Sequence, residues 1–420
     1  MRQLLVAAAA SAFALLTVRC GSSPAGTGAV APPADAGGGN SPDAGPAVDD
    51  GGSPIDAGGA PSADGGGGID AGGDLDAGGA PGADGGGGTA GPDGGTAASE
   101  CDGLMPDPGA KFLWISPPSS ACGSQASSDY AGHFALGSQH NPLEFEWATY
   151  DAEGNRLGGF SSTGRIIPRD SGFQTLGIWT GAGAPMDLWH MWTRAPDGSG
   201  PSRSVGSDAC GASIYPAATG GSIVLSVCGS LRGVTHVMRF DDAGELLYNS
   251  SVDAYPSDAA EGDASGAALV IARGDAVTGF RKTDLVGRWL NSDGSKMTDW
   301  LLLTSDDSSP MWMRALIDGG VAARQGDRWR MVVPAGHGAS DPPDWLSGRT
   351  ATDLHVIRGN RGYAFTTTSG EEVEVVTPSG KSCGKFQAGG SHVQIGGDGT
   401  VIALSGTCKR TVWPRLLGVR

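Results

Sequence analysis

Hydrophobic and polar residues alternate with a period of two along much of residues 100–420. The segments 143–147 (Leu-Glu-Phe-Glu-Trp) and 372–375 (Glu-Val-Glu-Val) show this alternation, which is typical of β-strands with one face in a core. The segments 222–227 and 400–404 are mostly apolar, as in strands that are buried on both faces. Helical periodicity is almost absent from this region. The pattern therefore predicts an all-β domain.

Turn motifs that end in glycine recur at a nearly constant interval. Their separations are 44, 46, 50 and 86 residues, and the last equals two steps of 43, so an intermediate unit is expected near Gly336 or Gly338. A period close to 45 residues accommodates four short strands, the unit of a β-propeller blade. We predict six or seven four-stranded blades, with stacked β-sandwiches as the alternative. The turn glycines are Gly154, Gly198, Gly244, Gly294 and Gly380.

A propeller ring has to close between its first and last segments. We therefore expect residues 112–115 (Phe-Leu-Trp-Ile) to lie beside the final strands, around residues 401–404 or 411–413.

Six cysteines in this region form three neighbouring pairs along the sequence. Each pair spans about 20 residues, roughly the length of a hairpin within one blade, and disulfides are expected in an exported protein. No Cys-x-x-Cys motif or nearby histidine indicates zinc. Several connectivities remain open, and the nearest-neighbour set is the simplest. The predicted pairs are Cys101–Cys122, Cys210–Cys228 and Cys383–Cys408.

The chain begins with an export signal. Met1 and Arg2 precede an apolar run at residues 4–18, which is too short to cross a bilayer comfortably as a helix. A basic start followed by such a run is typical of a signal peptide. We predict a signal peptide at residues 1–19.

Residues 20–99 form a tract of Asp-Ala-Gly-Gly units. After Cys20 the tract holds 27 of the 73 glycines and 11 aspartates, with no Lys, Arg or Glu. This composition buries too little apolar surface to offset its chain entropy, and a Gly-rich chain of this length has a root-mean-square span of roughly 50 Å. We predict a disordered linker that precedes an all-β domain at residues 100–420.

The junction between signal peptide and linker indicates a lipid anchor. Residues 16–20 (Leu-Thr-Val-Arg-Cys) resemble a bacterial lipobox, although Arg19 stands where lipoboxes carry Gly, Ala or Ser. A lipobox-like Cys, an Asp-Ala-Gly tract and a Trp-containing body together resemble the predicted envelope lipoproteins of myxobacteria. The resemblance covers residues 1–99 and implies lipidation at Cys20 and an outer-membrane location. Ordinary cleavage near Ala25 or Ala31, which would release a soluble protein, is the alternative.

The charge of the chain argues against one class of partner. The formal net charge is −17, and setting aside the 11 aspartates of the linker and the two arginines before it leaves −8 for residues 100–420. An acidic chain repels the phosphate backbone, so nucleic-acid binding is not expected.

No motif indicates a catalytic residue, a cofactor or a metal ligand. The seven histidines are dispersed along the chain. Residues 380–384 match Gly-x-Ser-x-Gly only formally, because a nucleophile elbow requires a strand before the serine and a helix after it.

Two acidic loops and two groups of tryptophans remain as candidates for ligand binding. The acidic stretch at residues 253–263 and the turn at residues 305–309 could hold calcium, but alternating ligand positions are absent, so solvated loops are preferred. Most tryptophans in blades pack in the core, whereas an exposed subset near the ring axis would offer a platform for carbohydrate. The candidates are Asp253, Asp258, Glu261, Asp263, Trp189 and Trp192 around His190, Trp289, Trp300 and Trp312.

These patterns predict an exported, lipid-anchored β-propeller of the cell envelope that acts as a non-enzymatic binding or scaffolding module. Its expected partners are the membrane, through the anchor, and an envelope protein or glycan, and a monomer is expected. The alternative function is a secreted propeller hydrolase or lyase that acts on polysaccharide. That activity would require two or three carboxylates to converge near the ring axis.

Overall fold

The computed structural model describes most of the C-terminal part of the chain. The chain divides into two units, Met1–Thr89 and Ala90–Arg420, and every described residue lies in the second. The predicted signal peptide, Cys20 and the predicted linker lie outside the described residues. The described residues are 100–106, 110–115, 125–141, 144–179, 188–207, 210–228, 234–254, 257–305, 312–325, 328–334, 336, 338–349, 352–357, 362–367, 371–404 and 409–417.

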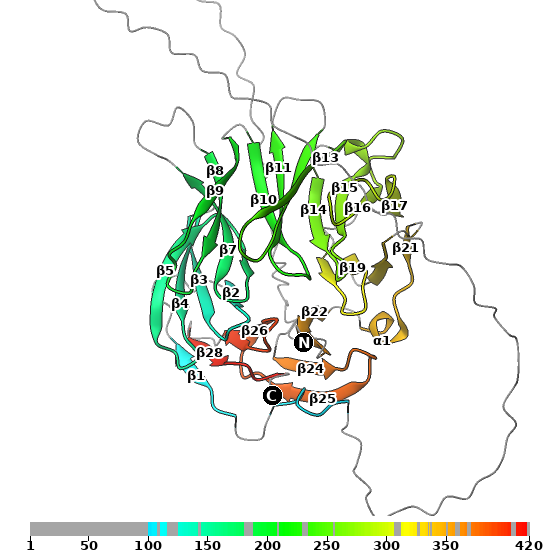
Figure 1. Cartoon of the computed structure of the whole chain (residues 1–420). Helices are drawn as coiled ribbons and strands as arrows, with labels where there is room; N and C mark the ends of the chain where they lie inside the picture. The colour runs from blue at the N-terminus through cyan, green and yellow to red at the C-terminus, as the bar shows by residue number, and fades with distance from the viewer. Residues whose placement is uncertain are drawn as a thin grey trace, which may run out of the picture. The chain divides into compact units, whose positions relative to one another are not determined.

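Within these residues, 28 strands form seven four-stranded antiparallel sheets, which are arranged in a ring (Figure 1). The protein is therefore a seven-bladed β-propeller. This confirms the predicted fold class, and the alternative of stacked β-sandwiches is wrong. The first strands of neighbouring blades contact one another around most of the ring, so these strands surround the ring axis.

The strands follow one another in chain order within each of the first six blades. Blades one to three contain β2 (Gln125–Ser128), β3 (Phe134–Asn141), β4 (Glu144–Tyr150) and β5 (Arg156–Ser162); β6 (Ile166–Pro168), β7 (Phe173–Trp179), β8 (Leu188–Arg194) and β9 (Ser202–Ser207); and β10 (Cys210–Pro216), β11 (Ser222–Cys228), β12 (Thr235–Phe240) and β13 (Leu246–Val252).

Blades four to seven contain β14 (Ser257–Gly262), β15 (Ala268–Arg273), β16 (Leu285–Leu290) and β17 (Leu301–Thr304); β18 (Trp312–Ala315), β19 (Val321–Gln325), β20 (Arg328–Val332) and β21 (Ala339–Ser340); β22 (Thr352–Ile357), β23 (Gly362–Thr367), β24 (Glu372–Val376) and β25 (Ser382–Gln387); and β26 (Ser391–Ile395), β27 (Val401–Leu404), β28 (Arg410–Trp413) and β1 (Leu113–Ile115).

The ring closes because the N-terminal strand completes the last blade. Strand β1 pairs antiparallel with β28, with Leu113 opposite Val412 and Ile115 opposite Arg410. Phe112, just before β1, lies with its ring centroid 5.7 Å from that of Trp413. The predicted meeting of residues 112–115 with residues 411–413 is confirmed.

The predicted turn glycines occupy one equivalent position in successive blades. Each lies in the turn between the third and fourth strands, and its N–H donates to the carbonyl three residues earlier at 2.9–3.1 Å. Gly336 supplies the expected intermediate unit. At Gly198, φ is 86°, and a Cβ would lie 2.5 Å from the carbonyl oxygen of Gly159 in blade one. A side chain there would push two blades apart.

The core consists of layers between neighbouring blades. In β15, Ala268, Val270 and Ala272 pack against blade three, while Leu269 and Ile271 pack against blade five. Because both faces of a central strand are buried, these strands lack polar alternation. The mostly apolar segment 222–227, now in β11, has the same cause.

Antiparallel pairing places all turns between first and second strands, and between third and fourth strands, on one side of the ring. We call this side the turn face. The described region also contains a 3-10 turn (Gly274–Ala276) and the one-turn helix α1 (Asp344–Ser347). In the part of the chain that the structure describes, no helix has the length and apolar character needed to span a membrane.

The structure corrects the predicted disulfide pairing. Cys101 forms a disulfide with Cys383, 282 residues away, so the predicted pairs Cys101–Cys122 and Cys383–Cys408 are wrong. The physical reason is ring closure: the N-terminal segment lies against the last blades rather than blade one, and Leu104 is buried in the core between blades six and seven.

Two other cysteines remain consistent with a local pair. Cys210 and Cys228 are opposite each other in the register of β10 and β11. Cys122 and Cys408 lie outside the described residues.

Candidate functional site

Charged and aromatic residues gather on the inner strands of blades two to six. Six lie in first strands, Arg165 directly precedes β6, and Arg324 lies in β19. Electrostatic and ring contacts join them across blade boundaries. We call this set the axial cluster. Its members are Arg165, Tyr215, Glu261, Trp312, Arg314, Arg324, Asp353 and His355.

Glu261 is the buried carboxyl of the axial cluster. The residue is 5% exposed, and its Oε1 accepts a hydrogen bond from the N–H of Ala315 in blade five at 3.1 Å. Burial raises the pKa of Glu261 to about 7, against the lowering effect of the positive charges of Arg314 and Arg165. Two arginines from blades five and two therefore act on one carboxyl, which is partly ionised at neutral pH.

Arg314 interacts electrostatically with four other charged members of the cluster. Burial lowers the pKa of its guanidinium, and the positive charges of Arg165 and Arg324 act in the same direction. The carboxyls of Glu261 and Asp353 raise that pKa. The charged groups of four blades therefore converge on one guanidinium.

Trp312 gives the cluster an exposed aromatic face. Its residue exposure is 42%, and the guanidinium carbons of Arg314 and Arg324 lie 5.6 and 5.9 Å from its ring centroid. Arg324 also forms an ion pair with Asp353, with 3.1 Å between Nη1 and Oδ1. An exposed indole beside two cations is thus fixed at the start of β18.

Arg165 and Tyr215 form the part of the cluster contributed by blades two and three. The Arg165 guanidinium carbon lies 5.6 Å from the ring centroid of Tyr215, and Arg165 is exposed. A guanidinium over an aromatic face is held in place and still presents donors to a ligand.

His355 adds no positive charge at neutral pH. Burial lowers its pKa to about 3, the positive charge of Arg314 acts in the same direction, and a hydrogen bond with the backbone of Ile395 in blade seven opposes them. The three arginines of the cluster outnumber its two carboxyls, Asp353 and Glu261, and burial raises the pKa of Glu261 to about 7. The axial cluster is net positive in a protein whose formal charge is −17.

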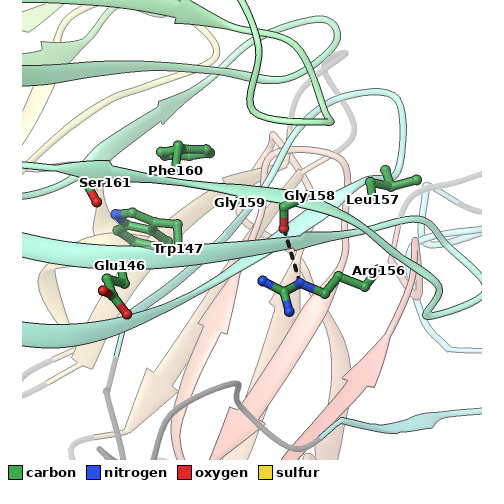
Figure 2. Close-up of a pocket in the computed structure, with 8 residues that line it drawn as sticks. All are labelled: Glu146, Trp147, Arg156, Leu157, Gly158, Gly159, Phe160 and Ser161. Atoms are coloured by element: carbon green, nitrogen blue, oxygen red, sulfur yellow. Dashed lines mark hydrogen bonds between the residues drawn. The ribbon is translucent and has the colours of Figure 1, made fainter.

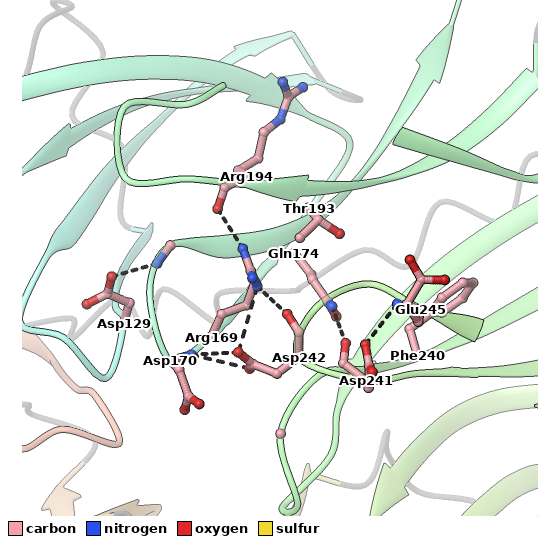
Figure 3. Close-up of polar contacts among 12 residues, drawn as sticks. Asp129, Arg169, Asp170, Gln174, Thr193, Arg194, Phe240, Asp241, Asp242 and Glu245 are labelled. Carbon is pink, nitrogen blue, oxygen red and sulfur yellow. Dashed lines mark hydrogen bonds and ion pairs between the residues drawn. The ribbon is translucent and has the colours of Figure 1, made fainter. Parts of the chain in front are cut away.

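A second polar region lies on the turn face and joins blades one to three (Figure 3). Asp129 is fully buried. Its Oδ1 accepts hydrogen bonds from the N–H groups of Ala131 and His133, and its Oδ2 accepts one from Gly172 of blade two at 2.7 Å. Asp263 occupies the equivalent position in blade four and accepts the N–H of Gly320 in blade five.

Arg169 continues this region from blade two to blade three. Its Nε donates to the backbone carbonyl of Asp242, and the N–H of Asp170 donates to the Asp242 carboxylate (Figure 3). Gln174 Nε2 donates to the carbonyl of Asp241 at 2.6 Å. These bonds use the polar groups to hold the blades together, so the role of this region is structural.

A groove of about 490 Å³ lies along the outer edge of blade one (Figure 2). Arg156 Nε donates to the carbonyl of Gly158 in its own strand at 3.4 Å, and Trp147 Nε1 donates to Ser162 Oγ at 2.9 Å. These polar groups of the groove therefore form hydrogen bonds within blade one. Its lining consists of Glu146, Trp147, Arg156, Leu157, Gly158, Gly159, Phe160 and Ser161.

The acidic candidates from the sequence do not form a calcium site among the described residues. Glu261 and Asp263 bind backbone N–H groups of blade five, while Asp253 pairs with Arg288 and accepts a hydrogen bond from Trp300 Nε1 at 2.9 Å. No group of three His, Cys, Asp or Glu residues in the described ranges is placed to hold a metal ion. The side chain of Asp258 and residues 306–309 lie outside the description.

The tryptophan candidates divide between core and surface. Trp289 is fully buried and Trp300 is 9% exposed. Trp192 is partly buried, with the Arg194 guanidinium 4.1 Å from its ring centroid, and Trp189 is packed against the core between blades two and three. The remaining candidate, Trp312, lies in the axial cluster.

The formal serine motif has no catalytic setting. Ser382 begins β25 after a hairpin turn, and the following Cys383 forms the disulfide with Cys101. A strand, rather than the helix that a nucleophile elbow requires, follows the turn.

Six members of the axial cluster were not predicted from the sequence. They are Arg165, Tyr215, Arg314, Arg324, Asp353 and His355. A positional signal was available. The turn after each first strand begins at a residue whose carbonyl accepts a hydrogen bond within the turn, and the residue two positions before it is polar or charged in three successive blades. These residues are Tyr215, Glu261 and Arg314. A polar or charged residue at this offset in successive blades marks side chains near the axis. Reading that signal requires the order of the strands within each blade.

The fold and the axial cluster define a seven-bladed β-propeller with a cationic, aromatic group of residues around its axis. No family model matches the sequence, and no curated protein matches it either. Among solved structures, the Pan2 WD40 domain of Neurospora crassa is similar with a TM-score of 0.46 and 10% identity, over 75% of this chain and 99% of that one.

Two further solved structures are similar to this chain. A streptogramin B lyase is similar with a TM-score of 0.41 and 12% identity, over 72% of this chain and 97% of that one. YCF48 bound to a D1 peptide is similar with a TM-score of 0.41 and 12% identity, over 76% of this chain and 99% of that one. At such identities the likeness concerns the fold alone.

Proposed function

We propose that this protein is an exported, lipid-anchored β-propeller that acts as a non-enzymatic binding module at the cell envelope. The axial cluster is the observation that carries the binding role. It combines an exposed indole with three guanidiniums, one from blade two and two from blade five. Such a combination of a flat apolar face and fixed donors suits ligand recognition.

The carboxyls of the cluster favour binding over hydrolysis. A glycoside hydrolase uses two carboxyl groups that flank the bond to be broken. Asp353 is engaged by Arg324 at 3.1 Å, and Glu261 accepts a backbone hydrogen bond and is 5% exposed. Neither is placed as a free acid or base at the exposed Trp312.

The proposed location follows from the sequence before residue 100. The predicted signal peptide directs export, Cys20 is the proposed site of lipidation, and the Gly- and Asp-rich linker would separate the propeller from the membrane by roughly 50 Å on average. The propeller would then sample a volume around its anchor and meet envelope components there.

Membrane fractionation of wild type and Cys20→Ser tests the anchor. Wild type should sediment with membranes, and the variant should remain in the soluble exported fraction. Mass spectrometry of the N-terminal peptide should find a diacylglyceryl group on Cys20. A soluble wild type whose mature chain begins after Ala25 or Ala31 would establish ordinary cleavage instead.

Incubation with envelope polysaccharides tests the non-enzymatic role. The purified protein should leave their chain length unchanged, as measured by size-exclusion chromatography and by reducing-end or unsaturated-product assays. Shortened chains would replace this proposal with the hydrolase or lyase alternative.

A further inference from the structure

The positive charge of the axial cluster stands out against the acidity of the rest of the protein. Residues that carry the cluster include three arginines and two carboxyls, and one of those carboxyls is largely hidden from solvent. The exposed groups are Arg165, Trp312 and, with a side-chain exposure of 42%, Asp353. A ligand that approaches the cluster therefore meets a cation, an indole face and an ion pair.

The arrangement of these groups indicates the chemistry of the ligand. An exposed indole face stacks on flat apolar surfaces such as the face of a sugar ring. The guanidiniums of Arg314 and Arg324 lie beside the Trp312 ring at 5.6 and 5.9 Å, and planar guanidiniums match carboxylates with paired donors. A ring that bears a carboxylate satisfies both features together.

We propose that the axial cluster binds a glycan containing hexuronic acid, with one sugar ring on Trp312 and its carboxylate at Arg314 and Arg165. This inference rests on the proposed function and names its ligand class. Arg324 remains paired with Asp353 and orients the platform. Tyr215 holds Arg165 in place through the contact between its ring and the guanidinium.

Glu261 makes this binding dependent on pH. The charged groups that act on Glu261 are Arg314 in β18 and Arg165, which directly precedes β6. Arg314 in turn interacts with Arg324, Asp353 and His355. When Glu261 is ionised it competes with the ligand carboxylate for the two arginines, and when it is protonated it does not. Its pKa of about 7 places that change between pH 8 and pH 6, where a uronate remains ionised.

Isothermal titration with three ligands tests the ligand class. Trigalacturonic acid should bind at least tenfold more tightly than the neutral galactose trisaccharide of the same linkage, and triglutamate should not bind. Equal binding of the neutral sugar would leave a simple carbohydrate platform and overturn the proposal. Binding of triglutamate, or no binding of the uronate, would also overturn it.

Substitutions locate the binding to the axial cluster. Arg165→Gln, at an exposed position, and Trp312→Ala should each weaken trigalacturonate binding at least fivefold without a change in melting temperature of more than a few degrees. Arg156→Gln in the groove of blade one is the matched control and should bind as wild type does. Unchanged binding in Arg165→Gln would contradict the proposed site.

The pH profile separates a specific role of Glu261 from general charge effects. Binding by wild type should tighten severalfold from pH 8 to pH 6, and Glu261→Gln should abolish most of this change. Recovery of intact trisaccharide after each titration tests the non-enzymatic function separately, and membrane fractionation tests the anchor separately. A failed ligand assignment is therefore distinguishable from a failed proposed function.

Discussion

The buried carboxyls of Asp129 on the turn face and Glu261 in the axial cluster differ in the hydrogen bonds that each accepts. Asp129 accepts three backbone N–H groups and lies 2.7 Å from His133 Nδ1. Glu261 accepts one backbone N–H at 3.1 Å. Donors that are fixed in place compensate a buried carboxylate, whereas a carboxylate with few donors is destabilised in its charged form.

This difference separates stability from binding in one fold. On the turn face, the carboxyls join successive blades, because they accept hydrogen bonds from groups of the protein itself. The axial cluster keeps a carboxyl whose charge changes near neutral pH and an excess of guanidiniums. We expect mutations in the first region to affect unfolding and mutations in the second to affect ligand binding and pH dependence.

The largest expected effect comes from the closing disulfide, which lies in neither region. Replacing both Cys101 and Cys383 by serine frees a loop of 282 residues and should lower the free energy of unfolding by about 6 kcal/mol in the chain-entropy model. Denaturant unfolding measures this loss. Trigalacturonate binding should stay within twofold of wild type, because no member of the axial cluster is changed.

Peptide mapping without reduction checks the disulfide directly. It should recover Cys101 linked to Cys383, and a Cys101–Cys122 peptide would contradict the structure. With Cys210 opposite Cys228 in the register, a peptide linking these two cysteines is expected as well.

The next largest effect is expected for Asp129→Ala. Removing the buried carboxyl leaves the buried N–H of Gly172 and the partly buried N–H groups of Ala131 and His133 without this acceptor, which should cost about 4 kcal/mol of unfolding free energy. Asp151→Ala is the matched control, because Asp151 accepts the N–H groups of Glu153 and Asn155 in a turn exposed to water. The control should lose only a small fraction as much. Equal losses would mean that burial does not distinguish the two turns.

Glu261→Gln should change stability in the opposite direction at alkaline pH. The folded pKa of about 7 lies above the ordinary value of 4.5, so the stability that protonation gives is present below pH 4.5 and is lost as pH rises through 7. Glutamine does not titrate, and the variant should gain up to about 3 kcal/mol relative to wild type at pH 8. Unfolding curves from pH 4 to pH 9 that stay parallel would contradict this expectation.

His355→Gln should have a smaller effect that appears only in acid. The folded pKa of about 3 lies below the ordinary value of 6.5, so wild type loses stability as pH falls below 6.5. The difference in unfolding free energy between the variant and wild type should therefore shift by about 2 kcal/mol in favour of the variant when the pH is lowered from 8 to 5. His236→Gln, at an exposed position, is the matched control for replacing an imidazole.

Most of the fold was predictable because blades repeat a local pattern. A four-residue turn requires a residue with positive φ, such as Gly198 or Gly244. This requirement is local, so the sequence shows it. The meeting of the first and last strands, β1 and β28, was predictable as well, because a ring has to close. The disulfide was not, since the segment containing Cys101 belongs in space to the last blades.

The candidate site was largely hidden in the sequence. Arg165, Glu261 and Arg314 are far apart along the chain, and each has ordinary neighbours. They become a site because Glu261 and Arg314 lie on innermost strands and Arg165 directly precedes one, and which strand is innermost depends on the closure of the whole ring. Trp312 was among several aromatic candidates, and only its exposure of 42% distinguishes it from Trp289.

Strand β1 gives the protein an unusual order of assembly. It is synthesised before every other strand, yet its partner β28 is synthesised last. Until β28 is synthesised, β1 and β27 each lack an antiparallel neighbour in the seventh blade, and unpaired strand edges invite pairing with other chains. Strand β28 lies between these two strands, so the seventh blade can form in full only after residues 410–413 have been synthesised.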